Sequence, residues 1–256
     1  MKKLISLVVL LSLIFVPSIT LAAPDFKGNR EFLKNSKISD ADKAVINSFI
    51  DTVQSETKDI KNSAEVAAKA NPIIDKYIAE TKLQGESLAI LYLIKSVYGF
   101  YKPTENVAIL SKALEISPDN KFLNNLIGMS QINVGDNNGA VKSFEKALKL
   151  DAVEDETKGF LTPSLYNNLA LAESNLGNTK TAFYYCDKAI EIAPKKYHAY
   201  SMRASLYAQQ GNYKFALEDA IKAKNLVIED GAKDKFALQN LNFMIFNLKR
   251  ELGIRY

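Results

Sequence analysis

The side chains that most often carry out chemistry are scarce in this sequence. Its 256 residues include one cysteine, Cys186, and one histidine, His198. A single thiol excludes an intramolecular disulfide and any metal site with several cysteine ligands, and a single imidazole excludes a cluster of histidine ligands. The composition therefore argues against most metalloenzymes and against catalytic triads. We expect no metal, no cofactor and no catalytic residue.

Two segments resemble binding sites but lack the parts that such sites need. Residues 135–143 have the glycines, Lys142 and Ser143 of a phosphate-binding loop, without its adjacent Gly-Lys-Ser. The acidic run Glu154-Asp155-Glu156 lacks the spaced oxygen ligands of a calcium loop. We therefore expect a turn between helices at the first segment and a solvated loop at the second.

The net charge of the chain does not indicate which kind of partner it binds. The chain has 33 Lys and Arg against 29 Asp and Glu, a net charge of +4. Loss of Lys2 and Lys3 with a signal peptide would lower this to about +2, too little for the broad basic field that binds nucleic acid through its phosphates. The 47% of hydrophobic residues is enough to bury a core. We therefore expect a globular protein with no nucleic-acid partner.

The first 22 residues have the three parts of a secretory signal. Lys2 and Lys3 precede the apolar run 4–16, and small residues follow at Ala22 and Ala23. The run is shorter than the roughly 20 residues of a membrane-spanning helix, so an uncleaved anchor is the lesser alternative. No cysteine lies nearby that could carry a lipid. We predict cleavage after Ala22 and a periplasmic or secreted bacterial protein, not a lipoprotein, with no stable membrane anchor.

A fixed period governs more than half of the remaining chain. Glycines that predict tight turns occur at Gly135, Gly177 and Gly211. Each is followed at constant offsets by two alanines, which are Ala140 and Ala147, Ala182 and Ala189, and Ala216 and Ala223. The last two units are 34 residues apart (211 − 177), and the first two are 42 apart (177 − 135), one period plus eight residues. Such a period is typical of a helical array.

The repeated unit is predicted to form a helix, a tight turn and a second helix. Glycine ends a helix at no steric cost, because it tolerates the left-handed conformation. Alanines seven residues apart share one face and let two antiparallel helices approach closely. A larger residue, Phe144, sits between them in the clearest unit, with Cys186 and Ala220 at the same place in the next two. The pattern predicts an all-α, right-handed solenoid of antiparallel helix pairs.

These residues resemble the tetratricopeptide repeat family. The family pattern is matched by Tyr166, Leu169, Ala170, Ala182, Ala189 and Pro194, then by Tyr200, Ala204, Tyr207, Ala216 and Ala223, and earlier by Gly128 and Phe144. The resemblance implies repeats at 121–154, 163–196 and 197–230, with a degenerate one at 87–120 in which Asn106 replaces an alanine. Arg203 stands where leucine is usual. A helical region at 23–86 and a capping helix at 231–256 would flank the array.

The flanking segments also carry helical patterns. Ser39 is a predicted cap for a helix whose apolar stripe comprises Val45, Ile46, Phe49, Ile50 and Val53. A second helix at 64–78 is predicted to be interrupted or kinked at Asn71-Pro72, and the stretch 88–98 to be a buried helix.

The last helix, 233–252, carries two apolar stripes. One is predicted to pack on the final repeat through Ala237, Leu241, Met244, Ile245, Leu248 and Leu252. The other, Phe236, Phe243 and Phe246, is a candidate second interface for a partner or another copy, the alternative being a helix clasped on both sides by its own chain.

The first helices of such units line a concave groove that binds protein segments. Residues predicted to point into it are Asn125, Met129, Asn167, Asn168, Leu171, Asn175, His198, Ser201, Met202, Ser205 and Gln209. Amides can hydrogen-bond an extended peptide backbone, while Met and Leu accept its side chains. Family members that hold the carboxylate end of chaperones use lysines and an arginine in the groove. Asn168 is the one position here that agrees with those members, and Asn125 and Met202 stand where they have cations, which argues against an acidic C-terminus as ligand.

These observations predict an exported, non-enzymatic adaptor that binds a partner protein or peptide. Two alternatives are an enzyme or accessory subunit of a cell-wall or secretion machine, and a structural multimer that assembles through the phenylalanine stripe. The enzyme would have to use the N-terminal helices, which contain carboxylates but no histidine or cysteine.

Overall fold

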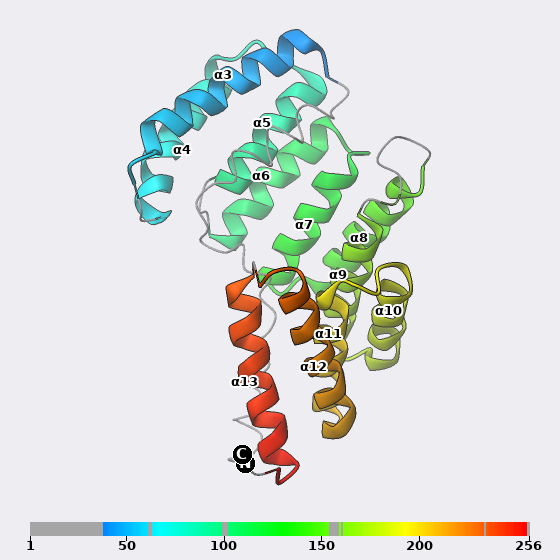
Figure 1. Cartoon of the computed structure of the whole chain (residues 1–256). Helices are drawn as coiled ribbons and strands as arrows, with labels where there is room; N and C mark the ends of the chain where they lie inside the picture. The colour runs from blue at the N-terminus through cyan, green and yellow to red at the C-terminus, as the bar shows by residue number, and fades with distance from the viewer. Residues whose placement is uncertain are drawn as a thin grey trace. The chain divides into compact units, whose positions relative to one another are not determined.

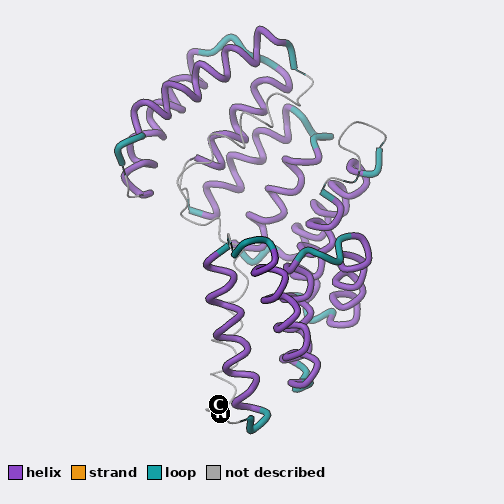
Figure 2. The backbone as a smooth tube through the Cα atoms, viewed as in Figure 1, coloured by secondary structure: helices purple, strands orange, loops and turns teal. Residues whose placement is uncertain are grey.

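The computed structural model describes residues 38–60, 63–98, 102–153, 159, 161–232 and 234–254. Within these ranges the chain forms eleven helices and no strand, as Figures 1 and 2 show. The predicted all-α class is therefore confirmed. The predicted signal peptide and the acidic run 154–156 lie outside the described residues.

The chain divides into two compact units between Gly135 and Asp136. The described helices of the N-terminal unit are α3 (Asp40–Thr57), α4 (Ser63–Glu80), α5 (Gly85–Tyr98), α6 (Pro103–Ile116) and α7 (Lys121–Asn133). Those of the C-terminal unit are α8 (Asn137–Asp151), α9 (Thr162–Asn175), α10 (Thr179–Ile192), α11 (Tyr197–Gln209), α12 (Tyr213–Glu229) and α13 (Lys235–Glu251). Hydrophobic clusters lie within each unit.

Helices α3 to α5 share the first core of the N-terminal unit. The Ser39 hydroxyl caps α3 by accepting a hydrogen bond from the Asp42 amide at 3.1 Å, as predicted. Ile46, Phe49 and Ile50 are buried, whereas Val45 is 40% exposed and so does not belong to the buried stripe. Helix α4 continues through Pro72 without interruption, since Ala70 and Ile74 on either side pack into the same core and offset the lost backbone hydrogen bond.

Helices α5 and α6 form the helix pair expected at 87–120. The predicted burial of the stretch 88–98 is confirmed for Leu91 and Ile94, which are at most 1% exposed. Asn106 replaces a packing alanine, and its buried amide donates a hydrogen bond to the Ser130 hydroxyl of α7 at 3.1 Å. The amide nitrogen thus has a partner on the next helix, whereas the Oδ1 atom of Asn106 is buried without a hydrogen bond.

The C-terminal unit shows why the repeat needs its glycines and alanines. Gly177 and Gly211 have φ angles of 81° and 76°, in the left-handed region where other residues are strained. The six repeat alanines are all at most 3% exposed, and Phe144 and Cys186 are fully buried. Burial raises the pKa of the Cys186 thiol, which favours a packing role for this cysteine over a reactive one.

A buried carboxylate joins the two ends of the insertion between α8 and α9. Asp151, the last residue of α8, is fully buried. Its Oδ2 atom accepts hydrogen bonds from the Leu161 amide and the Thr162 hydroxyl, both at 2.9 Å. The Gly159 amide donates to the Asp151 backbone carbonyl at 2.9 Å. These hydrogen bonds therefore fix the start of α9 to the end of α8, although the loop between the two helices lengthens the repeat by eight residues.

Helix α13 packs against α12 and α11, and Figure 1 shows it beside α12. The predicted contacts of Ala237, Leu241, Met244 and Leu248 are confirmed by their burial, and Ile245 is partly buried in the same cluster. The prediction for Leu252 is wrong, because this residue follows the last turn of α13 and is 38% exposed.

Candidate partner-binding face

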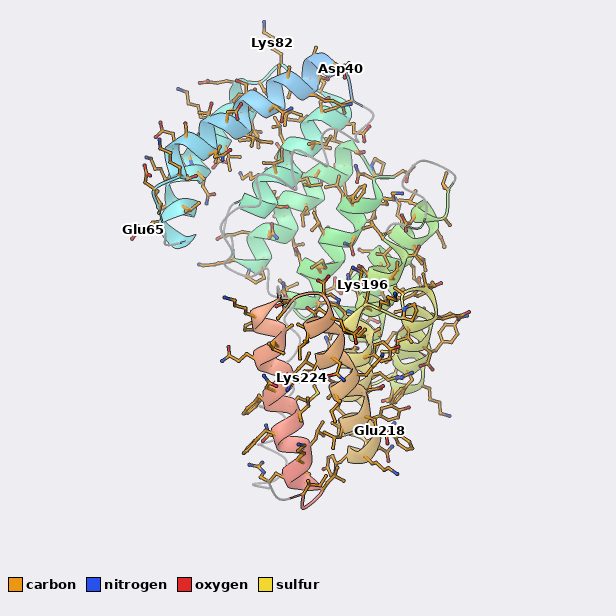
Figure 3. The ribbon with its side chains drawn as sticks, viewed as in Figure 1. Asp40, Glu65, Lys82, Lys196, Glu218 and Lys224 are labelled. Carbon is orange, nitrogen blue, oxygen red and sulfur yellow. The ribbon has the colours of Figure 1, made fainter. Side chains whose placement is uncertain are left out.

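The first helices of the repeats at 163–196 and 197–230 are α9 and α11. They contact each other as well as the second helices α10 and α12. Figure 3 shows the side chains of this unit, with Lys196 just before α11 and Glu218 and Lys224 on α12. The two adjacent first helices are the elements that would have to present a binding groove.

Five of the predicted groove residues are buried in the structure. They are Asn167, Leu171, Ser201, Met202 and Ser205, each at most 7% exposed. The Ser205 hydroxyl donates to the backbone carbonyl of Ser201 at 3.1 Å. The neighbouring helices of the unit therefore cover these residues. A partner would not reach these five side chains, which corrects the expectation that they line an open surface.

Four predicted residues of these helices remain accessible, and we call them the amide face: Asn168, Asn175, His198 and Gln209. Asn168 is half-buried and the others are exposed. Asn168 and Asn175 are seven residues apart, and His198 and Gln209 eleven apart, about two and three helical turns. Each pair therefore shares one side of its helix.

Two members of the amide face have neighbours that orient them. The Asn175 amide donates to the Asn137 side chain of α8 at 3.0 Å. The His198 ring stacks on Tyr197, with 3.9 Å between centroids. The surrounding protein partly desolvates His198 and lowers its pKa, Lys196 adds to this effect, and Asp234 opposes it. A neutral imidazole offers one donor and one acceptor to a peptide.

The two remaining predicted groove residues, Asn125 and Met129, lie on α7 in the N-terminal unit and are half-buried. The structure therefore places them in a different unit from the amide face. In the C-terminal unit, the predicted residues that are accessible are the four of the amide face.

Arg203, on another side of α11 from His198 and Gln209, is held by two carboxylates of its own unit. Its guanidinium donates from Nε and Nη2 to the two carboxylate oxygens of Asp219, at 2.7 and 2.9 Å, and from Nη1 to Asp187 at 2.6 Å. The Tyr200 ring lies under it at 5.8 Å. The hydrogen bonds with Asp219 raise the pKa of Arg203 further above its usual range. The cation therefore clamps α10, α11 and α12 together and is not available to a ligand carboxylate.

A second polar contact links α11 to α13. The Tyr197 hydroxyl donates to Asp234 Oδ2 at 2.5 Å, and Asp234 also accepts from the Ala237 amide at 2.8 Å, which caps α13. Desolvation tends to raise the pKa of Asp234, but the hydrogen bonds from Tyr197 and Ala237 outweigh it, and the net pKa is lowered. Burial and the same hydrogen bond raise the pKa of Tyr197.

The lowered pKa of Asp234 predicts an acid-sensitive contribution to stability. A depressed carboxylate stabilises the fold above its unfolded pKa of about 3.9, and this contribution is lost as the pH falls through the lower folded value. We expect Asp234→Asn to lower the free energy of unfolding by up to about 1 kcal/mol at pH 7. The difference from the wild type should disappear near pH 2. Thermal unfolding of both proteins across this range measures it, and a constant difference would refute the assignment.

The described residues contain neither a candidate metal site nor a candidate membrane-spanning helix. In the part of the chain with assigned positions, no group of three or more His, Cys, Asp or Glu side chains could hold a metal ion. Among the same residues, no helix has both the length and the hydropathy to cross a membrane.

Comparison with known proteins identifies the repeats. A model of the tetratricopeptide repeat matches residues 123–153 and 163–196. The first match covers α7 and α8, which belong to different units, and the second covers α9 and α10. The chain is thus a helical-repeat protein in which these two segments match the tetratricopeptide repeat. No curated protein matches it in sequence.

Solved structures with the same fold are distant in sequence. The crystal structure of MamA has a TM-score of 0.52 at 17% identity, over 66% of this chain and 92% of that one. The MamA RS-1 ArsTM double mutant has a TM-score of 0.55 at 15% identity, over 77% and 98%. The APC/C hetero-tetramer Cut9-Hcn1 has a TM-score of 0.58 at 15% identity, over 88% of this chain but 46% of the other. These similarities establish a tetratricopeptide-like solenoid fold.

Proposed function

We propose that this protein is an exported, non-enzymatic scaffold that binds a partner protein or an extended peptide segment on the amide face of α9 and α11. The observation that carries the proposal is the accessible set of Asn168, His198 and Gln209 on two adjacent first helices of a tetratricopeptide array. Amide and imidazole groups can donate to and accept from a peptide backbone. A repeat array holds such groups on a rigid surface.

The chemistry of this face favours a neutral peptide backbone over an acidic chain end. Arg203, the arginine of α11, is already engaged by Asp219 and Asp187. Binding a ligand carboxylate would require breaking those contacts and leaving Asp219, which is 8% exposed, without its cation. Arg203 is therefore not available to a ligand carboxylate, and the groups of the amide face itself are uncharged amides and an imidazole.

Partner recovery from cells tests this proposal. We expect the double variant Asn168→Arg with Gln209→Arg to recover at least tenfold less partner than the wild type, because two long cations would cover the amide face. The matched control is Asn138→Arg with Asn225→Arg, which adds the same charge at exposed positions of α8 and α12. Equal recovery by all three proteins, with unchanged helicity by circular dichroism, would refute the proposed face.

Export rests on the predicted signal peptide and has its own test. Mass spectrometry of the protein from the cell envelope should find Ala23 as the first residue. An intact Met1 on that protein would show that the segment is retained.

A further inference from the structure

The hydrogen bond between Asn175 and Asn137 gives one part of the amide face a fixed polarity. Asn175, the last residue of α9, is exposed, and Asn137, the first residue of α8, is half-buried. The Nδ2 atom of Asn175 donates to the Oδ1 atom of Asn137 at 3.0 Å. Both residues belong to the C-terminal unit. The bond engages the nitrogen of the Asn175 carboxamide and leaves its oxygen for other donors.

The ends of the two helices favour this direction of the bond. The first N–H groups of a helix have no partner within it and carry partial positive charge, which favours a side-chain oxygen there. The last C=O groups carry partial negative charge, which favours an NH2 group. Asn137 supplies the oxygen at the start of α8, and Asn175 supplies the nitrogen at the end of α9. Turning both carboxamides over would lose the match at both helix ends.

Gln209 occupies the matching place on the next first helix but is not held in this way. It is the last residue of α11 and follows Asn175 by 34 residues (209 − 175), one period. It is exposed, and among the described residues its carboxamide has no hydrogen-bond partner. Gln209 can therefore rotate and offer either its N–H or its oxygen to a ligand, whereas Asn175 offers an oxygen.

We propose that Asn137 is a positioning residue of the amide face, which holds Asn175 so that its Oδ1 atom accepts a hydrogen bond from a peptide N–H of the partner. This inference rests on the proposed function and adds the chemistry of one contact. Every residue of an extended peptide except proline carries a main-chain N–H. A carboxylate or a carbonyl of the partner would meet another oxygen there and is disfavoured. The partner therefore passes Asn175 with an N–H directed at it.

Charge substitutions at Asn137 test which end of Asn175 the partner meets. Aspartate accepts hydrogen bonds, so Asn137→Asp keeps the observed direction of the bond. Lysine only donates, so Asn137→Lys turns the Asn175 oxygen toward the lysine and leaves Nδ2 for the partner. With a photoreactive side chain at Asn168 of the full-length protein in cells, Asn137→Asp should capture as much partner as the wild type. Asn137→Lys should capture about tenfold less, because a donor then faces a donor.

A rescue variant separates the direction of the bond from the size and charge of lysine. In Asn137→Lys with Asn175→Asp, the lysine donates to one carboxylate oxygen and the other oxygen remains for the partner's N–H. Capture should return to within about twofold of the wild type. The matched controls are Asn138→Asp and Asn138→Lys, which place the same charges at an exposed neighbouring position. Both should capture as the wild type does, and circular dichroism checks that every variant keeps its helicity.

The outcomes distinguish this inference from the function on which it rests. Equal capture by Asn137→Asp and Asn137→Lys, with normal helicity, would overturn the role of Asn137 and leave the amide face in place. Failure of the rescue variant would do the same, as would equal losses in Asn137→Lys and Asn138→Lys, because added bulk or charge would then explain the effect. No capture by the protein with Asn137 intact would overturn both the amide face and this inference.

Discussion

Phe144→Ala should lower the free energy of unfolding by about 3 to 5 kcal/mol, the range found when a buried phenylalanine is truncated. Phe144 is fully buried in α8, and Ala140 and Ala147 on the same helix are fully buried as well. These neighbours are too small to fill the space that the ring would leave, so a cavity would remain. Urea unfolding followed by circular dichroism measures the loss.

The control for this prediction lies on the same helix. Lys142 is exposed, so Lys142→Ala should change the free energy of unfolding by no more than about 0.5 kcal/mol. If Phe144→Ala cost as little as this control, Phe144 could not occupy the interior position that the repeat assigns to it.

Arg203→Ala is expected to cost about 3 kcal/mol, because it leaves Asp219 buried without the cation that neutralises it. The Arg203 side chain is 22% exposed and that of Asp219 is 11% exposed, whereas that of Asp187 is 61% exposed. Asp187→Ala should therefore cost less than about 1 kcal/mol, as is usual for a surface pair.

A double variant separates the cost of an unpaired charge from the value of the pair. Arg203→Leu with Asp219→Leu removes both charges and restores the leucine that is usual at position 203. We expect its stability to lie within about 1 kcal/mol of the wild type, since apolar replacement of both partners is often neutral. Thermal unfolding of the series measures this. If Arg203→Ala cost no more than Asp187→Ala, Arg203 would not clamp the three helices.

The repeat could be predicted from the sequence because its signals are local. Gly177 and Gly211 have the positive φ angles that tight turns after helices require. The alanines recur at fixed offsets because two helices can approach closely only where side chains are small. Neither inference needs knowledge of distant contacts.

The polar contacts between helices could not be predicted in the same way. Arg203 and Asp219 are 16 residues apart on different helices, and only the packing of α11 on α12 brings them together. Asp151 looks like an ordinary acidic residue at the end of a helix, yet it is fully buried and holds the start of α9. The absence of the usual leucine at 203 was the one sequence signal for such a contact.

The candidate site was predicted only in part. Of the residues that helical spacing assigns to a groove, Asn168 is half-buried and His198 and Gln209 are exposed, and their role in binding remains a prediction. Helical spacing does not reveal how the neighbouring helices pack, and that packing buries Asn167, Ser201 and three other predicted groove residues. The width of a groove depends on helix packing, which the spacing of residues along one helix does not determine.

Site-resolved crosslinking in living cells tests the amide face most directly. A photoreactive side chain would replace Asn168 or Gln209 in turn, with Asn138 and Asn225 as exposed control positions on α8 and α12. We predict that both amide-face positions capture the same partner protein and that neither control position captures it. Capture at the control positions with none at Asn168 and Gln209 would contradict the proposed binding face.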